Sequence, residues 1–288
     1  MLAYRHGFHA GNHADVLKHL VLVQVLAHLN EKDKGWRFVD THAGAGGYSL
    51  EGGYATKHRE FEGGIGRLLT QPLRTDLPPP VAAYVDEVRR FNGSNALRQY
   101  PGSPAFARQC MRAQDQLRLF ELHPTEHKIL ASYVGDDEGV EVRLADGFAG
   151  LKSVLPPPTR RGLTLIDPPY ELKTDFARAL GALREALTRF PEGVVMLWLP
   201  QVQTVESAQL PQRLKAAADA LARKGWLHAR LSVAQADARG FGLMGSSLFV
   251  ANPPHTLHAS LQPVLPWLAR ELAQFDGAKG FVERSVKS

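Results

Sequence analysis

The sequence predicts an α/β fold in which helices cover both faces of a mostly parallel sheet of seven strands. Short apolar runs typical of buried strands alternate along the chain with longer segments whose apolar residues have helical spacing. Several of these runs end in acidic or glycine-rich sequences. Such endings are typical of open parallel sheets, which bind ligands at the carboxyl ends of their strands.

The first predicted element is a helix over residues 14–34, where apolar residues recur every three or four positions from Val16 to Leu29. The predicted strands span residues 36–40, 117–121, 140–144, 163–167, 193–199, 229–234 and 247–251. A helical pattern over residues 212–224 follows the fifth strand. No helical pattern separates the last two strands, so we expect them to form an antiparallel pair.

The long connection between the first two strands indicates an insertion. Residues 47–116 form a connection far longer than is usual between such elements. They include the proline-rich stretch 77–80 and a helical pattern over 81–91. We therefore expect a helical insertion subdomain at residues 52–100 and a main domain built from residues 1–51 and 101–288. We assign no role to residues 275–288.

Composition limits the possible classes of function. The chain has 288 residues, of which 44% are hydrophobic, as in an ordinary globular protein. The single cysteine, Cys110, excludes an intramolecular disulfide framework and fits a cytoplasmic protein. We recognise neither a signal peptide nor an apolar stretch of membrane-spanning length, so no membrane partner is expected. The net charge of +5 and the pI near 9.3 permit a polyanionic partner without requiring one.

The strongest chemical signal is the sequence Asp167-Pro168-Pro169-Tyr170 at the end of the fourth strand. An ionised Asp167 accepts hydrogen bonds, and the Pro168 carbonyl is a second acceptor beside it, so together they suit the two donors of an exocyclic amine. Proline restricts its own φ and the preceding residue, which holds the two acceptors in place. Tyr170 offers a face on which a nucleobase can stack. A strand stopped by a polyproline turn is the alternative interpretation of this motif taken alone.

The other strand ends carry residues suited to a nucleoside-containing cofactor. The first strand is followed by His42 and by a glycine loop with Gly44, where the backbone can approach a ligand closely. Glu121 ends the second strand and offers two acceptors to a ribose diol. Asp146 and Gly147 follow the third strand, where an adenine would lie. Each feature alone could mark a turn or a helix cap, but their order along the chain favours a cofactor site.

These motifs resemble those of a known class of enzymes. Asp-Pro-Pro-Tyr resembles motif IV of S-adenosylmethionine-dependent amino-methyltransferases, and the ordered strand ends resemble motifs I, II and III of class I methyltransferases. Further similarity lies in the sequences YRHGFHAGNHADVLKH at 4–19, DTHAGAG at 40–46, YPGSP at 100–104 and RGL at 161–163. Together these segments are similar to the RlmJ family of bacterial 23S rRNA adenine-N6 methyltransferases, and the similarity extends to about Trp267.

The resemblance implies a Rossmann-like class I methyltransferase domain that uses S-adenosylmethionine and no metal. It implies a monomer that forms N6-methyladenosine in 23S rRNA, either naked or in early assembly. The implied cofactor residues are Lys18, His19, His42, Gly44, Ser103, Glu121, Asp146, Gly147 and Asp167. The implied catalytic residues are Asp167, Pro168 and Tyr170, and Tyr4 and His6 are expected to contact the RNA. Without the resemblance, solvated helix positions would be the simpler interpretation of Lys18 and His19.

Several alternatives remain open from the residues alone. Gly44 and Gly46 match part of a dinucleotide-binding fingerprint, but Ser49 stands where its third glycine belongs. His123 and His127 have the H-x-x-E-H spacing of some zinc proteases, although no third ligand is indicated. A DNA or protein-glutamine target would use similar chemistry. A non-catalytic RNA-binding protein could also retain the fold.

Overall fold

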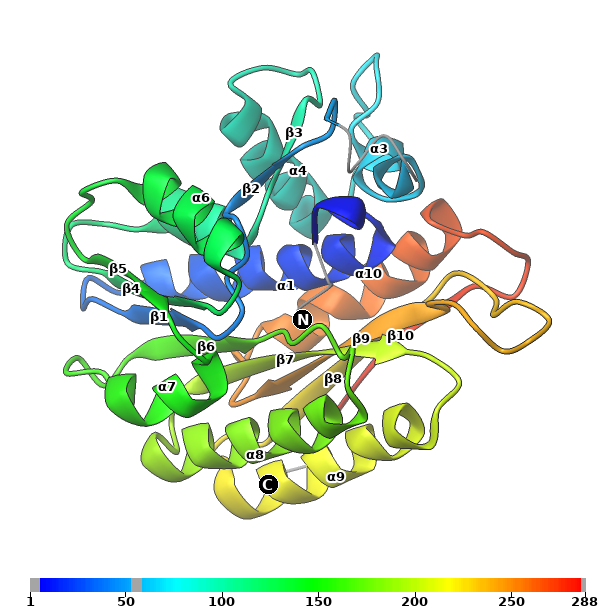
Figure 1. Ribbon diagram of the computed structural model, residues 1–288. Helices are drawn as coiled ribbons and strands as arrows, with labels where there is room; N and C mark the ends of the chain where they lie inside the picture. The colour runs from blue at the N-terminus through cyan, green and yellow to red at the C-terminus, as the bar shows by residue number, and fades with distance from the viewer. Residues whose placement is uncertain (1–5, 53–58, 286–288) are drawn as a thin grey trace.

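A central eight-stranded sheet organises the computed structural model, which describes residues 6–52 and 59–285. The strand order is β10-β8-β9-β7-β6-β1-β4-β5 (Figure 1). The strands are β1 (Arg37–Asp40), β4 (Gln116–Glu121), β5 (Val140–Leu144), β6 (Gly162–Ile166), β7 (Val194–Gln201), β8 (Trp226–Ser232), β9 (Gly245–Ala251) and β10 (Lys279–Arg284). The strands from β5 to β7 pair in parallel, whereas β9 is antiparallel to both β7 and β8. The predicted mostly parallel sheet with antiparallel final strands is confirmed.

Side chains that alternate along the strands point into two separate hydrophobic cores. Phe38 and Leu165 belong to one core, and their chain neighbours Val39 and Ile166 belong to the other. This alternation follows from the two-residue period of a strand, which requires apolar residues at successive positions when both faces are covered. The first core involves helices α1 (His13–Asn30), α5 (Ser103–Cys110), α6 (Pro124–Val134) and α10 (Leu257–Glu271), and the second involves α7 (Gly147–Val154), α8 (Lys173–Arg189) and α9 (Val205–Leu221). In Figure 1, α8 and α9 lie below the sheet, and α1 and α10 lie above it.

Helix α1 is buried on nearly every side. Asn12 caps its first turn, with Oδ1 accepting hydrogen bonds from the backbone N–H groups of Ala14 and Asp15. The helix ends at Asn30, before the predicted residue 34, because the next four residues are charged and no apolar residue among them reaches the core. Lys18 and His19 are only 4% and 1% exposed. The interpretation of these two residues as solvated helix positions is therefore wrong.

A small second sheet joins the two ends of the insertion between β1 and β4. Strand β2 (Gly47–Ser49) pairs antiparallel with β3 (Gln99–Pro101), a ladder too short to be predicted from the sequence. Between them lie the short helices η2 (Glu60–Gly63) and α3 (Ile65–Leu68) and the longer helix α4 (Pro79–Asn92). Helix α4 packs against α1, α5 and α10. The boundary of a separate subdomain at residues 52–100 stays a prediction.

The central sheet has one strand more than predicted. Strand β10 lies in the segment to which we assigned no role, and it pairs antiparallel with β8. Its residues Phe281 and Val282 are adjacent instead of alternating with polar residues, so the sequence gives only a weak strand signal there. Across the two described ranges, no helix is long and apolar enough to cross a bilayer.

Candidate active site

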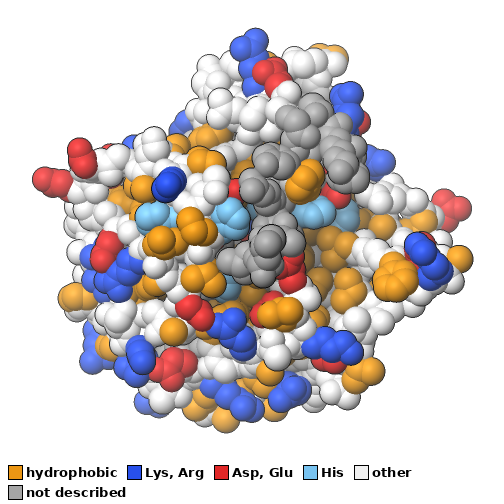
Figure 2. All heavy atoms as spheres, in the orientation of Figure 1, with side chains coloured by type: hydrophobic (Ala, Val, Ile, Leu, Met, Phe, Trp, Pro, Cys, Tyr) orange, Lys and Arg blue, Asp and Glu red, His pale blue; other side chains and the backbone are white. Residues whose placement is uncertain are grey.

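A cavity of about 540 Å³ lies at the carboxyl ends of the parallel strands. This size is typical of a small-molecule or cofactor site. The cavity is lined by twelve of the predicted site residues, namely His6, Lys18, His19, His42, Gly44, Ser103, Glu121, Asp146, Gly147, Asp167, Pro168 and Tyr170. The thirteenth, Tyr4, lies outside the described residues. Histidine side chains gather on this face of the molecule (Figure 2).

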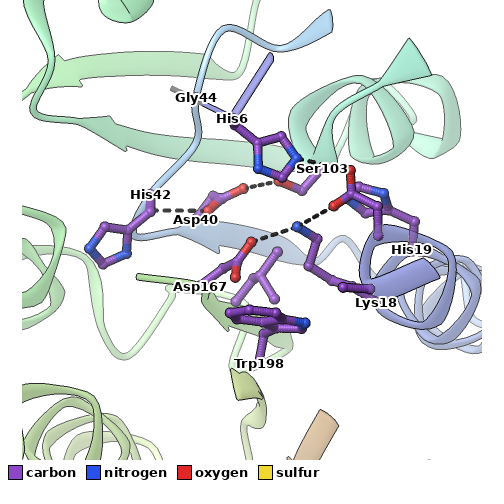
Figure 3. A network of polar contacts seen from close by, with 12 residues as sticks. His6, Lys18, His19, Asp40, His42, Gly44, Ser103, Asp167 and Trp198 are labelled. Atoms are coloured by element: carbon purple, nitrogen blue, oxygen red, sulfur yellow. Dashed lines mark hydrogen bonds and ion pairs between the residues drawn. The ribbon is translucent and has the colours of Figure 1, made fainter. Parts of the chain in front are cut away.

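The ammonium group of Lys18 lies between two carboxylates inside the cavity wall. Lys18 Nζ is 2.6 Å from Asp167 Oδ2 and 2.8 Å from Asp15 Oδ1 (Figure 3). Burial disfavours the charge on Lys18, but the two carboxylates outweigh burial and raise its pKa above the ordinary lysine value. Lys18 is therefore a fixed cation. It contacts the predicted catalytic acid directly.

Asp15 extends this set of contacts to the start of the chain. Its Oδ2 lies 2.9 Å from His6 Nε2 and accepts a hydrogen bond from the Gly11 backbone N–H at 2.9 Å. Burial opposes ionisation of Asp15, but His6 and Lys18 outweigh burial and hold its pKa well below the ordinary value. A continuous line of polar contacts thus runs from His6 through Asp15 and Lys18 to Asp167. It places His6, a predicted RNA contact, beside the cavity.

A second buried acid, Asp40, positions two of the predicted cofactor residues. Ser103 Oγ donates a hydrogen bond to Asp40 Oδ2 at 2.6 Å, and the His42 backbone N–H donates to Oδ1 at 3.2 Å. Burial raises the pKa of Asp40 to about 7. Burial also lowers the pKa of His42 to about 4, so its ring is neutral at pH 7. The ring of Phe148 packs edge-on against the His42 ring, with centroids 4.7 Å apart.

The Glu121 carboxylate accepts hydrogen bonds from the backbone that follows two neighbouring strands, β1 and β4. Its Oε2 accepts a hydrogen bond from the Gly44 N–H at 2.8 Å, and its Oε1 accepts from the His123 N–H at 2.6 Å. Burial raises the pKa of Glu121 above the ordinary glutamate value. Each carboxylate oxygen has a second lone pair, so both can still accept a hydroxyl from a ligand. The predicted role toward a ribose diol is therefore compatible with these contacts.

Asp146 caps helix α7 as well as lining the cavity. Its Oδ1 accepts hydrogen bonds from the Phe148 and Ala149 backbone N–H groups, and its Oδ2 pairs with Arg178. Gly147 is needed for close packing, because a Cβ placed there would lie 2.0 Å from the Thr41 carbonyl oxygen. Gly147 therefore lets the start of α7 pack against the end of β1.

The Asp-Pro-Pro-Tyr sequence forms another part of the cavity wall. Asp167 and Pro168 follow β6, and Tyr170 has a left-handed backbone with φ of 52°. The Tyr170 hydroxyl donates a hydrogen bond of 2.7 Å to the Trp198 carbonyl. Its ring also contacts Phe176, with centroids 4.6 Å apart. These contacts fix the orientation of the ring, which remains partly exposed and lines the cavity.

His19 contributes a buried, uncharged ring to the cavity wall. Its Nδ1 lies 2.7 Å from the Tyr100 hydroxyl, whereas its buried Nε2 has no hydrogen-bond partner among residues 6–52 and 59–285. Burial holds the pKa of His19 well below the ordinary histidine value, so one ring nitrogen donates and the other accepts.

The site also contains Asp15, Asp40 and Trp198, which were not predicted from the sequence. Asp15 and Lys18 are three residues apart on one helix, a spacing that could have suggested an ion pair. Asp40 stands at the end of a predicted strand, where its carboxylate could have been included with those of the other strand ends. No sequence pattern indicated Trp198, because it accepts the Tyr170 hydrogen bond through its backbone carbonyl.

The H-x-x-E-H sequence has a local structural role. His123 is the N-cap of α6, and its Nδ1 accepts a hydrogen bond from the Thr125 N–H at 3.2 Å. In the part of the chain that the structure describes, no three His, Cys, Asp or Glu side chains are grouped to hold a metal ion.

Known proteins resemble this chain over nearly its full length. Residues 33–283 match the model of the family described as "Ribosomal RNA large subunit methyltransferase D, RlmJ". Ribosomal RNA large subunit methyltransferase J of Escherichia coli is 44% identical over 94% of each chain, and that of Haemophilus influenzae is 42% identical over 94% of each chain. The crystal structure of a Legionella pneumophila protein superposes with a TM-score of 0.86 at 31% identity, covering 97% of this chain and 99% of that one. The family predicted from the motifs is confirmed: the chain belongs to the RlmJ family of ribosomal RNA large subunit methyltransferases.

Proposed function

We propose that this enzyme transfers a methyl group from S-adenosylmethionine to the N6 amine of an adenine in 23S rRNA. The observation that carries the proposal is the arrangement of Asp167 and Pro168 at the end of β6. Asp167 is anchored by a buried cation and faces the same cavity as the predicted cofactor residues. An amine with two N–H donors matches the carboxylate and the neighbouring carbonyl.

The residues around the amine act mainly by positioning it. The adenine N6 lone pair is delocalised into the ring, so the amine is a weak nucleophile. Hydrogen bonds from N6 to Asp167 and to the Pro168 carbonyl favour a pyramidal nitrogen with its lone pair directed away from them. Holding the nitrogen in line with the methyl donor then supplies much of the rate enhancement.

Lys18 positions Asp167 as a hydrogen-bond acceptor. The ion pair holds the carboxylate at the cavity wall, where it can accept a hydrogen bond from the amine. Asp167 or water takes the surplus proton of N6 during or after methyl transfer.

A base within folded RNA must leave its stack to reach this cavity. The ring of Tyr170, fixed by Trp198 and Phe176, offers a surface that replaces part of the lost stacking. His6 lies beside the cavity, where it can contact the RNA backbone.

The remaining cavity residues fit the cofactor, which supplies the methyl group when bound. Glu121 would accept the ribose hydroxyls, and Asp146 with the Phe148 ring would hold the adenine. His19, Ser103 and Lys18 lie on the side of the cavity left for the methionine part. We further propose that the enzyme acts in the cytoplasm, where a ribosomal RNA substrate would be found. We also propose that it acts as a monomer, because one chain supplies all of the proposed contacts.

Transfer of labelled methyl to unmodified, protein-free 23S rRNA tests the proposal, with identification of the nucleosides after digestion. The wild-type enzyme should form N6-methyladenosine, and Asp167→Ala should lose the activity. Asp136→Ala, which removes an exposed acid after α6, is the matched control and should retain full activity. Cofactor binding without transfer to RNA would contradict the rRNA assignment and direct the search to DNA and protein amides. Failure to bind the cofactor would support a non-catalytic RNA-binding protein.

A further inference from the structure

The loop between β8 and β9 lies at the rim of the active-site cavity. Because β9 is antiparallel to β7, residues 233–244 emerge at the same sheet edge as the carboxyl end of β7, where Gln201 pairs with Gly245. The Met244 N–H donates a hydrogen bond of 2.9 Å to the Gln201 carbonyl, and Leu243 lines the cavity. In Figure 1 the connection between β8 and β9 projects beyond the sheet. The loop therefore borders the path into the site.

The tip of this loop is an ordered turn built around Asp237. The Asp237 carboxylate accepts hydrogen bonds from the Arg239 and Phe241 N–H groups, each at 2.9 Å. The Asp237 backbone N–H donates to the Phe241 carbonyl at 2.7 Å, and Gly240 takes a φ of +84° that favours glycine. Hydrogen bonds from backbone N–H groups, that of Phe241 first, lower the pKa of Asp237. The turn thus presents its side chains in fixed directions.

The turn presents an aromatic ring and a guanidinium group to solvent. Phe241 is 67% exposed, and the side chain of Arg239 is 79% exposed. The Arg239 guanidinium lies 5.5 Å from the centre of the Phe241 ring. Arg239 also pairs with Asp237 at 3.2 Å, but an ion pair this exposed is strongly screened and leaves the guanidinium open to another anion. An exposed aromatic side chain on an ordered loop beside an active site indicates a binding surface.

Other exposed side chains near the cavity are apolar or charged. Leu172 is 63% exposed and lines the cavity, and Val205 is 66% exposed at the start of α9. The side chain of Lys173 is 84% exposed and has only a long contact of 3.9 Å to Glu206, which also lines the cavity. Figure 2 shows hydrophobic and basic side chains, with acidic ones among them, on this face of the molecule.

We propose that the β8–β9 turn binds a nucleotide that flanks the target adenine, with Phe241 stacking on its base and Arg239 contacting its phosphate. The inference rests on the proposed RNA substrate. When the target base leaves its stack, its neighbours lose stacking partners at the cavity mouth. An aromatic face beside a guanidinium is the combination that binds single-stranded nucleotides without selecting their sequence. The turn therefore contributes to RNA affinity and takes no part in methyl transfer.

Steady-state methylation of 23S rRNA by substituted enzymes tests this surface. Phe241→Ala should raise the KM for RNA about tenfold, with kcat within about twofold of wild type and unchanged S-adenosylmethionine affinity. Phe241→Trp, which keeps an aromatic face, should restore the KM, whereas Phe241→Leu should not. Arg239→Ala should weaken RNA binding and make that binding less dependent on salt concentration. Phe281→Ala is the matched control, because Phe281 is an exposed phenylalanine on β10 and should give wild-type values.

Fluorescence provides a readout that does not require methyl transfer. The indole introduced by Phe241→Trp should be quenched by a single-stranded RNA oligonucleotide, in excess of the change shown by wild-type protein.

An unchanged KM in Phe241→Ala together with no added quenching would overturn the proposal. A loss of cofactor affinity in Phe241→Ala would also overturn it, because the loop would then be structural. An effect seen only with ribosomal particles, and not with protein-free RNA, would overturn it in favour of a protein partner. If wild-type enzyme transfers no methyl group to RNA, the proposed function fails, and the fluorescence titration still decides whether this turn binds RNA.

Discussion

The Nζ atom of Lys18 lies 2.6 Å from Oδ2 of Asp167, although 149 residues separate the two in the chain. The contact joins the opening helix to the end of β6. It also gives the predicted catalytic carboxylate a partner that holds its position before any substrate binds. The placement of the carboxylate in the Asp-Pro-Pro-Tyr motif therefore depends on a residue far outside the motif.

Removing this cation should affect both stability and activity. Lys18→Met leaves Asp15 and Asp167 without their shared partner, and breaking a buried ion pair costs about 3–5 kcal/mol of unfolding free energy. Methyl transfer should fall by a factor of about 100 or more, because the carboxylate loses its fixed orientation. Chemical denaturation and methylation assays measure the two effects. Lys173→Met, which removes a lysine from a long and exposed pair, should cost less than about 1 kcal/mol of unfolding free energy. Equal stability of Lys18→Met and wild type would contradict the expectation.

Two substitutions of Tyr170 distinguish the role of its ring from the role of its hydroxyl group. Tyr170→Phe removes only the hydrogen bond to the Trp198 carbonyl, at a cost of about 1 kcal/mol, and should retain activity within a few fold. Tyr170→Ala removes the stacking face and should raise the KM for RNA by a factor of about 10 to 100. Kinetics at varied RNA concentration distinguish the two variants. Similar losses in both would show that the hydroxyl, and not the ring, carries the function.

Gly147 and Gly181 offer a matched pair of glycine substitutions. Gly147→Ala places a Cβ 2.0 Å from the Thr41 carbonyl oxygen, so the end of β1 or the start of α7 must move, at a cost of about 3 kcal/mol. Gly181→Ala lies inside α8 with no atom within 4 Å of the new Cβ, and should stabilise the protein by about 0.5–1 kcal/mol. Thermal unfolding of both variants is the measurement. Opposite signs are expected, and a tolerated Gly147→Ala would show that these two elements do not pack as described.

Asp40 should make stability depend on pH in the direction opposite to most acids. Burial raises its folded-state pKa to about 7 from the model-peptide value of 3.8, so the folded protein binds a proton that the unfolded chain has lost between these values. The free energy of unfolding therefore decreases as pH rises through this window, by at most about 4 kcal/mol in total.

Asp40→Asn should remove this dependence. Its amide cannot ionise, and the Ser103 hydroxyl can turn to accept a hydrogen bond from it. Relative to wild type, the variant should gain stability as pH is raised from 5 to 8, measured by denaturation at each pH. A difference between the two proteins that stays constant across this range would show that Asp40 does not titrate there.

The sequence allowed the strand ends to be predicted, and with them most of the cavity wall. In a parallel sheet the carboxyl ends lie at one edge, so Glu121, Asp146 and Asp167 had to lie near one another once their strands were recognised. The pair between Lys18 and Asp167 could not be predicted in the same way, because it depends on where α1 packs against the sheet. The raised pKa of Asp40 could not be predicted either, because it arises from burial in the assembled fold. Strands as short as β2 and β3 contain too few residues for an alternating apolar pattern to be recognised.

The burial of α1 on nearly every side has a consequence for biosynthesis. The helix packs against β9, which is synthesised much later than α1. At elongation rates of about 5–20 residues per second, roughly 10 to 40 seconds pass between synthesis of Asn30 and synthesis of Ala251. Throughout that interval the nascent chain carries a strongly apolar helix without one of its final partners, so we expect α1 to need chaperone protection.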